Sequence, residues 1–220
     1  MEGKGLEEKE FYVKGLEEKG FYVIPSFLSV DECAFFLESF EQTDEKTPRL
    51  EDPTLLEFLK SRCQEKLELK PPYGPRFWLF VFVCFCSLTF KRFGLSGYWF
   101  AIERGINHSF HRDHGTFYTN QSHANMLFVW IAVQKPIAEL SNLSLLERGD
   151  WFGQFVHGGA SRIEDGLIWD DQTGQTNPVP PSAKETTPHV KQGDALVFKA
   201  DMFHKTQDAS TVEEKRKTNN

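Results

Sequence analysis

A histidine and an aspartate stand two residues apart at His111 and Asp113, and a second histidine, His204, follows much later in the chain. Two imidazoles and one carboxylate are the protein ligands of the facial iron(II) site in non-haem oxygenases. Residues i and i+2 of a β-strand point to the same face. If the stretch around His111 is a strand, His111 and Asp113 can hold one metal ion while Arg112 points away.

The second histidine follows a turn and a short apolar strand, GDALVFK, at residues 193–199. A histidine just beyond a buried strand is well placed to face a cavity. A single His-x-Asp is a weak signal in a chain with 7 His and 32 acidic residues. A lone histidine is more often a hydrogen-bonded core or loop residue. The later strand that ends near His204 favours metal binding over that alternative.

Further polar and aromatic residues surround these three candidate ligands. A regular strand turns His114 away from the metal together with Arg112, which predicts a structural role for His114. Phe128 and Trp130 belong to an apolar run and are expected in the core. Three residues flank the middle of the chain, where a substrate could be recognised: Trp151, Arg162 and Trp169.

The composition indicates one globular domain with a large aromatic core. The chain has 220 residues, which is enough for a domain with its own core, and 21 of them are Phe. The net charge of −7 argues against a nucleic-acid partner and offers no basic patch for a membrane surface. No zinc-type pair occurs among the cysteines, which indicates reduced thiols of an intracellular protein: Cys33, Cys63, Cys84 and Cys86.

The N-terminus contains a short tandem repeat. Residues 4–13, KGLEEKEFYV, return almost unchanged as residues 14–23, KGLEEKGFYV. Because one copy is redundant, we expect residues 1–13 to be loosely held and residues 14–220 to form a single domain. The charged start has no apolar stretch typical of a secretory signal, which predicts a cytoplasmic protein.

A strand and two helices are predicted next. Residues 21–25 are typical of a strand stopped by proline. Ser29 and Glu32 fit a capping box that begins a helix, and Asp52-Pro53 fits a second helix start. We expect four residues of the first helix to point inward: Ala34, Phe35, Leu37 and Phe40. The second helix has one apolar face: Leu55, Leu56, Leu59, Cys63 and Leu67.

The run at residues 77–90, FWLFVFVCFCSLTF, is the most apolar part of the chain. It is shorter than the roughly 20 residues that a membrane helix needs. One or two buried strands are the favoured interpretation. A membrane or partner contact and an insertion foreign to the domain remain alternatives.

Short strands and turns alternate from Tyr98 onward, with little helical period, which predicts a barrel or sandwich. The loop at 170–188 separates the first two candidate ligands from the third and is long enough to be a lid or disordered. The predicted strands span residues 98–103, 109–118, 126–133, 151–156, 166–169 and 195–199.

The whole layout resembles the phytanoyl-CoA dioxygenase family of iron(II)- and 2-oxoglutarate-dependent oxygenases. The segments that carry the resemblance are GFYVIPSFLSVDECAFFLESF, NHSFHRDHGTF, NMLFVWIAV and GDALVFKADMFHKT. The resemblance implies a mainly β protein with N-terminal helices, built as a double-stranded β-helix, that is, a jelly-roll or cupin-like barrel. It also implies hydroxylation of a small or lipid-like molecule, with release of succinate and CO2 from 2-oxoglutarate.

The resemblance further implies roles for individual residues. His111, Asp113 and His204 would hold Fe(II), with O2 as the oxidant and ascorbate as a reductant. Thr206, two residues after the distal histidine, and Arg216 would bind 2-oxoglutarate, with Tyr98 as a further donor. Because the chain ends at Asn220, we expect the strand that carries Arg216 to be cut short. The presence of Asp113 favours hydroxylation over halogenation, which needs that metal position open for chloride.

Three functional interpretations remain open. The first is an oxygenase that uses iron and 2-oxoglutarate on a small-molecule substrate, without nucleic acid and without a membrane span. The second is a jelly-roll protein that binds metal through the same three residues and does not use 2-oxoglutarate. The third is a catalytically inactive homologue, which the tandem repeat and the apolar run favour. Nothing in the residues decides the substrate or the oligomeric state.

Overall fold

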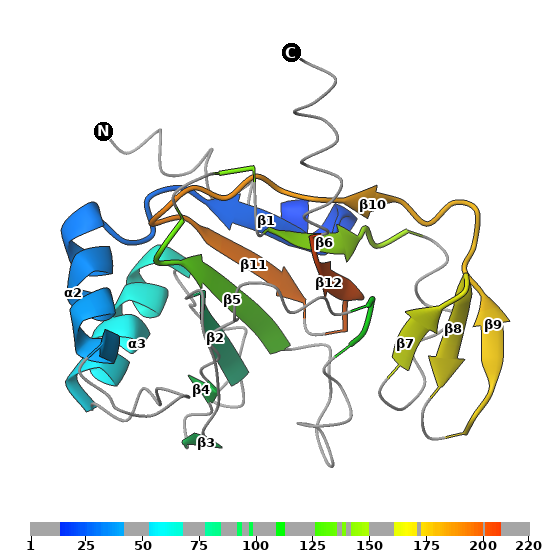
Figure 1. Ribbon diagram of the computed structural model, residues 1–220, viewed down its shortest axis with the longest axis horizontal. Coiled ribbons are helices and arrows are strands. Elements are labelled where there is room, and N and C mark those ends of the chain that lie inside the picture. Colours follow the sequence, from blue (N-terminus) through cyan, green and yellow to red (C-terminus); the bar gives the residue numbers. More distant parts are fainter. Residues whose placement is uncertain are drawn as a thin grey trace.

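Short strands dominate the computed structural model, which is mainly β with few helices (Figure 1). The structure describes residues 14–41, 53–67, 78–84, 92–93, 97–98, 109–112, 126–135, 138–139, 142–149, 161–170, 173–199 and 201–207. Several residues singled out above lie outside these ranges: residues 1–13, Cys86, Asp113, His114, Trp151 and Arg216.

Four strands form one sheet in the order β1-β11-β5-β2. Strand β11 (Ala195–Lys199) lies between β1 (Phe21–Ile24) and β5 (Met126–Ala132), antiparallel to both, and β2 (Trp78–Cys84) runs parallel to β5. Valine, isoleucine, leucine and phenylalanine fill the central strands, which suits positions covered on both faces. The strands predicted at 21–25, 126–133 and 195–199 are confirmed.

The apolar run contributes β2 to this sheet. Residues 78–84 form a strand, as the favoured interpretation predicted, and the rest of the run lies outside the described residues. Among the helices that the structure describes, none is long and apolar enough to cross a membrane.

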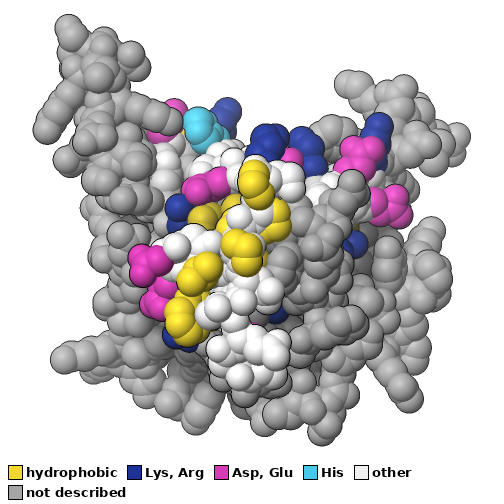
Figure 2. Space-filling view, turned by 90° about the vertical axis from the view of Figure 1, so that its right-hand side faces the viewer, with side chains coloured by type: hydrophobic (Ala, Val, Ile, Leu, Met, Phe, Trp, Pro, Cys, Tyr) yellow, Lys and Arg dark blue, Asp and Glu magenta, His cyan; other side chains and the backbone are white. Residues whose placement is uncertain are grey.

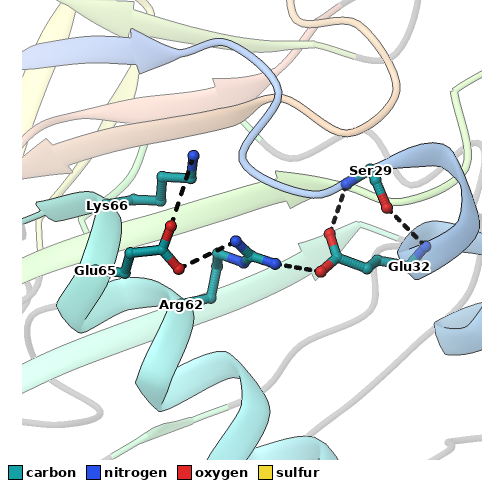
Figure 3. Close-up of polar contacts among 5 residues, drawn as sticks. All are labelled: Ser29, Glu32, Arg62, Glu65 and Lys66. Carbon is teal, nitrogen blue, oxygen red and sulfur yellow. Dashed lines mark hydrogen bonds and ion pairs between the residues drawn. The ribbon is translucent and has the colours of Figure 1, made fainter. Parts of the chain in front are cut away.

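Helix α2 (Val30–Glu41) begins with the predicted capping box (Figure 3). The Ser29 N–H donates to Glu32 Oε2 at 2.7 Å, and the Glu32 N–H donates to Ser29 Oγ at 3.1 Å. Arg62 of helix α3 (Pro53–Leu67) forms an ion pair with Glu32, which ties the two helices together. Burial raises the pKa of Glu32, but the Ser29 hydrogen bond and Arg62 outweigh it, so the pKa lies below its usual value.

The predicted inward face of α2 is wrong at Ala34 and Phe35, whereas Leu37 packs against the core as predicted. Phe36 is fully buried, whereas Phe35 is 52% exposed and Ala34 is exposed. The aromatic ring of Phe36 lies 5.7 Å from that of Phe58 in α3, and Cys33 is also buried. Adjacent phenylalanines allow two helical faces, and the contact with α3 selects the face of Phe36. The face predicted for α3 holds at Leu59 and Cys63, both fully buried.

A second sheet consists of two three-stranded parts. One part has the order β10-β6-β12 and the other β7-β8-β9, all antiparallel. Isolated bridges from His111 to His204 and to Arg162 place the segment 109–112 between β12 and β7. We call the whole the joined sheet. Its strands are β10 (Glu185–Thr186), β6 (Leu143–Leu146), β12 (His204–Thr206), β7 (Ser161–Glu164), β8 (Leu167–Asp170) and β9 (Thr176–Pro178).

The prediction of strands was incomplete here. Strand β8 matches the strand predicted at 166–169, but the strands at β6, β7, β9, β10 and β12 were not predicted. The supposed loop at 170–188 contains β9 and β10, so the prediction of an irregular loop is wrong for its described part. A small hairpin of β3 (Arg92–Phe93) and β4 (Gly97–Tyr98) completes the described strands.

Three layers result from the way the sheets bury their side chains. One face of the four-stranded sheet carries residues such as Val129 and Val197, which pack with Phe36 and Leu59 of the helices. We call the four-stranded sheet the covered sheet. Its other face, with Phe128, Trp130, Leu196 and Phe198, meets Leu143 and Leu145 of the joined sheet. The helices therefore cover one side of the covered sheet and the joined sheet lies on the other (Figure 1).

A glycine controls the entry into β1. Gly20 has a φ of 87°, and its carbonyl accepts a hydrogen bond from the Lys199 N–H at 2.9 Å. A Cβ atom at this position would lie 2.5 Å from Met202 Sδ and 2.8 Å from Arg148 Cγ. Only glycine satisfies both the left-handed backbone and this close approach.

Candidate metal centre

Two of the three predicted metal ligands lie side by side in the joined sheet. The His111 N–H donates to the His204 carbonyl at 3.0 Å, and the His204 N–H donates to the His111 carbonyl at 3.0 Å. Residues that exchange both hydrogen bonds point their side chains to the same face. Accordingly, the two imidazole centroids are 4.5 Å apart, at an angle of 50°. The structure thus brings His111 and His204 together, although they lie far apart in the sequence, and their binding of a metal stays a prediction.

Each imidazole is held in place by a backbone carbonyl two residues earlier. His111 Nδ1 lies 2.8 Å from the Ser109 oxygen, and His204 Nδ1 lies 3.2 Å from the Met202 oxygen. Because a carbonyl can only accept, Nδ1 carries the proton in both rings. In the neutral form of such a ring the lone pair is on Nε2, the atom with which the imidazole can bind a metal.

Aromatic residues of the covered sheet pack against the histidine pair. His204 is only 6% exposed, and its ring lies 5.2 Å from that of Phe198 and 6.4 Å from that of Phe128. His111 is half-buried. The pair therefore sits at the boundary between the apolar interlayer core and a more open part of the joined sheet. Phe128 is in the core, as predicted.

The opposite face of the same segment is structural. Arg112 is buried, and its guanidinium lies 4.8 Å from the ring centroid of Phe203, the residue before His204. Burial lowers the pKa of Arg112, and the nearby carboxylates Asp201 and Asp170 partly offset this effect. The prediction that Arg112 points away from the histidines is confirmed by this alternation.

The remaining predicted site residues are only partly described. Thr206 lies in β12 two residues after His204, on the same face, and is half-buried. Tyr98 is the last residue of β4, where it pairs with Arg92 of β3. Its side chain lies outside the described residues. Asp113 and Arg216 lie outside as well. Within the described part of the chain, no group of three or more metal-binding side chains occurs.

One charged residue near the interlayer core was not predicted. Lys135 is 7% exposed, and its ammonium lies 5.2 Å from the ring centroid of Trp130. The indole N–H of Trp130 is buried without a hydrogen-bond partner among the described atoms. A lysine three residues after a strand gives no signal of burial in the sequence, because only the three-dimensional packing brings it over the indole.

The donor set fits a metal that prefers nitrogen and oxygen ligands. Two neutral imidazoles from adjacent positions in one sheet, each oriented by a carbonyl, form two thirds of a facial site. Neither of the free cysteines that the structure describes, Cys33 and Cys63, takes part, since both are buried near the helices. A carboxylate on the same face would complete the set.

Comparisons with known proteins add no assignment. A scan against models of protein families found no match, and a search of curated proteins found no significant relative.

Proposed function

We propose that the protein is a non-haem iron(II)- and 2-oxoglutarate-dependent dioxygenase that hydroxylates a small or lipid-like molecule. The observation that carries the proposal is the pairing of His111 and His204 within one face of a sheet, with both Nδ1 atoms bonded to carbonyls. A pair of histidines placed only for packing needs neither the shared face nor the matched tautomers.

The third ligand in this proposal is Asp113. If the chain continues as a strand after Arg112, period-two alternation would put the residue two positions after His111 on the face of both histidines. His111, Asp113 and His204 would then hold Fe(II) and leave three coordination positions for 2-oxoglutarate and O2. The metal, when bound, would supply the oxidising chemistry that couples conversion of 2-oxoglutarate and O2 into succinate and CO2 with hydroxylation of the substrate.

The proposal assigns the rest of the site to positioning. Thr206 shares the face of His204, which supports a role in orienting 2-oxoglutarate, and Arg216 and Tyr98 are the further candidates. The apolar core around Phe128 and Phe198 would exclude water from one side of the metal. Two facing, largely antiparallel sheets with helices on one side support a jelly-roll barrel as the fold.

Succinate formation tests the proposal directly. Purified protein is incubated with Fe(II), ascorbate, O2 and 2-oxoglutarate, and succinate is measured without added substrate, because uncoupled turnover does not require it. We expect succinate from the wild type and none from Asp113→Ala. His189, an exposed histidine outside the pair, offers the matched control: His189→Gln should keep the wild-type rate.

Metal binding separates the possible failures. Equilibrium dialysis with Mn(II) should show one site that Asp113→Ala and His204→Gln both weaken. Metal binding without any succinate would leave a metal-binding protein that does not use 2-oxoglutarate. Absence of both metal binding and succinate would refute the proposal.

A further inference from the structure

The histidine pair belongs to a longer row of side chains across the joined sheet. Leu145 pairs with His204, His204 with His111, His111 with Arg162, and Arg162 with Trp169. Residues directly opposite each other in antiparallel strands point to the same face. All five side chains therefore line one face of the joined sheet in a single transverse row, which we call the histidine row.

Arg162 is the immediate neighbour of His111 in this row. The backbone N–H and C=O of His111 both form hydrogen bonds with His204. The pairing of His111 with Arg162 is therefore of the non-hydrogen-bonded kind. In such pairs the Cα atoms are about 4.5 Å apart and the side chains are closest. The backbone of Arg162 therefore lies beside that of the predicted metal ligand, and its side chain, which is ion-paired with Glu164, extends from the same face.

Trp169 gives this arginine a defined orientation. The Arg162 guanidinium lies 5.3 Å from the ring centroid of Trp169, and its Nε donates to Glu164 Oε2 at 3.1 Å. A guanidinium stacked on an indole and held at Nε is preorganised for bidentate recognition of a carboxylate or phosphate. The indole beside it provides an apolar surface for the body of the same ligand.

Exposure rises along the histidine row from the core outward. Leu145 is fully buried, His204 is 6% exposed, and the Arg162 side chain is 40% exposed. A ligand can thus reach the histidines from the side of β7, β8 and β9. Figure 2 views the molecule from this side, where hydrophobic side chains form a stripe flanked by acidic and basic ones.

We infer that Arg162 and Trp169 form the substrate-recognition site, and that the substrate is an amphiphilic anion whose carboxylate or phosphate binds Arg162 beside the metal. The inference rests on the proposed function for its link to the metal. It narrows the substrate from any small molecule to one that combines a negative group with an apolar or aromatic body.

Binding of 4-fluorophenylacetate, followed by 19F NMR on the full chain, tests the inference. We expect saturable binding that Arg162→Gln weakens about tenfold or more, as expected when a hydrogen-bonded charge is removed. Arg162→Lys should recover only part of the affinity, because a point charge lacks the planar fork. The neutral 4-fluorophenylethanol should bind weakly to the wild type and equally to Arg162→Gln.

A matched arginine controls for general effects of charge. Arg62 also pairs with a glutamate but lies in α3, and Arg62→Gln should bind the anion like the wild type. Equal affinity of the wild type and Arg162→Gln for 4-fluorophenylacetate would overturn the inference. So would an Arg162→Gln variant that loses affinity for 2-oxoglutarate alone, because Arg162 would then bind the cosubstrate.

Loading with Mn(II) tests the position of the anion relative to the metal. Paramagnetic broadening of the bound 19F signal falls steeply with distance, so strong broadening is expected if Arg162 holds the ligand beside His111. Weak broadening in protein that does bind Mn(II) would overturn the inference. Failure to bind Mn(II) would instead refute the proposed function, and with it the claim that the anion binds beside a metal. The titrations without metal would still decide whether Arg162 binds the anion.

Discussion

The covered sheet and the joined sheet use their side chains in opposite ways. In the covered sheet, the central residues of β5 and β11 are fully or almost fully buried on both faces. In the joined sheet, β9 is exposed along its whole length, β10 is partly exposed, and histidines and an arginine occupy one face. The two sheets share one apolar interlayer core, which ends at His204.

This contrast separates stability from chemistry. The covered sheet and its helices bury the apolar surface that drives folding. The joined sheet carries polar side chains next to the interlayer core, which packs against His204 on one side. Substitutions in the first region should therefore lower the free energy of unfolding, and those at the polar residues of the histidine row should mainly lower ligand affinity.

The largest effect is expected in the helix layer. Phe36→Ala removes a fully buried ring and should lower the free energy of unfolding by about 3–5 kcal/mol. Urea denaturation measures the change, and Mn(II) affinity of the folded fraction should stay the same. The neighbouring Phe35→Ala, at a position 52% exposed, is the control and should cost less than about 1 kcal/mol. Similar losses from both variants would contradict the assigned face.

A loss of metal affinity should follow from His204→Gln. Changing a residue behind a metal ligand typically costs 10- to 100-fold in affinity, so removing a ligand should cost about 100-fold or more, about 2.7 kcal/mol. Equilibrium dialysis with Mn(II) measures it, and the urea midpoint of the metal-free protein should move little. A variant with unchanged Mn(II) affinity would remove His204 from the site.

A smaller loss of stability is expected at the start of α2. Ser29→Ala removes the side-chain acceptor for the Glu32 N–H and should lower the free energy of unfolding by about 1 kcal/mol. Ser29→Asp keeps an acceptor at the cap and should retain most of the stability. Urea denaturation of the three proteins would distinguish the cap from a general effect of residue 29.

The smallest effect concerns pH. Because the pKa of folded Glu32 lies below its usual value of 4.5, its ionised form stabilises the fold above that pH. This contribution is lost as the pH falls through the folded pKa. Glu32→Gln keeps a capping side chain but loses the charge. The free energy of unfolding of the wild type should therefore be higher than that of the variant by about 0.5 kcal/mol at pH 7. A difference that persists unchanged at pH 3 would contradict the assignment.

Local signals in the sequence were sufficient where one segment determines its own structure. The capping box at Ser29 and Glu32, and the turn before the apolar residues 195–199, correctly predicted a helix start and a strand. The assignment of Phe35 to the inward face failed because a second phenylalanine follows it, and only the packing with α3 distinguishes the two positions.

Non-local pairing decides most of the joined sheet. Strands of two to four residues, such as β10 and β12, are too short to show a period in the sequence. The ligand pattern predicted that His111 and His204 converge, but the register that aligns Arg162 and Trp169 with them depends on partners far along the chain. Trp169 and Arg162 were therefore only general candidates for recognition from the sequence.

The close approach at Gly20 also explains how a duplicated sequence can have one defined place in the fold. The two copies of the repeat, residues 4–13 and 14–23, differ at a single position, where the first has Glu10 and the second has Gly20. A glutamate at this position would need a strained left-handed backbone and would have to displace the side chains of Met202 and Arg148. This single amino-acid difference therefore favours the second copy over the first as the edge strand beside β11.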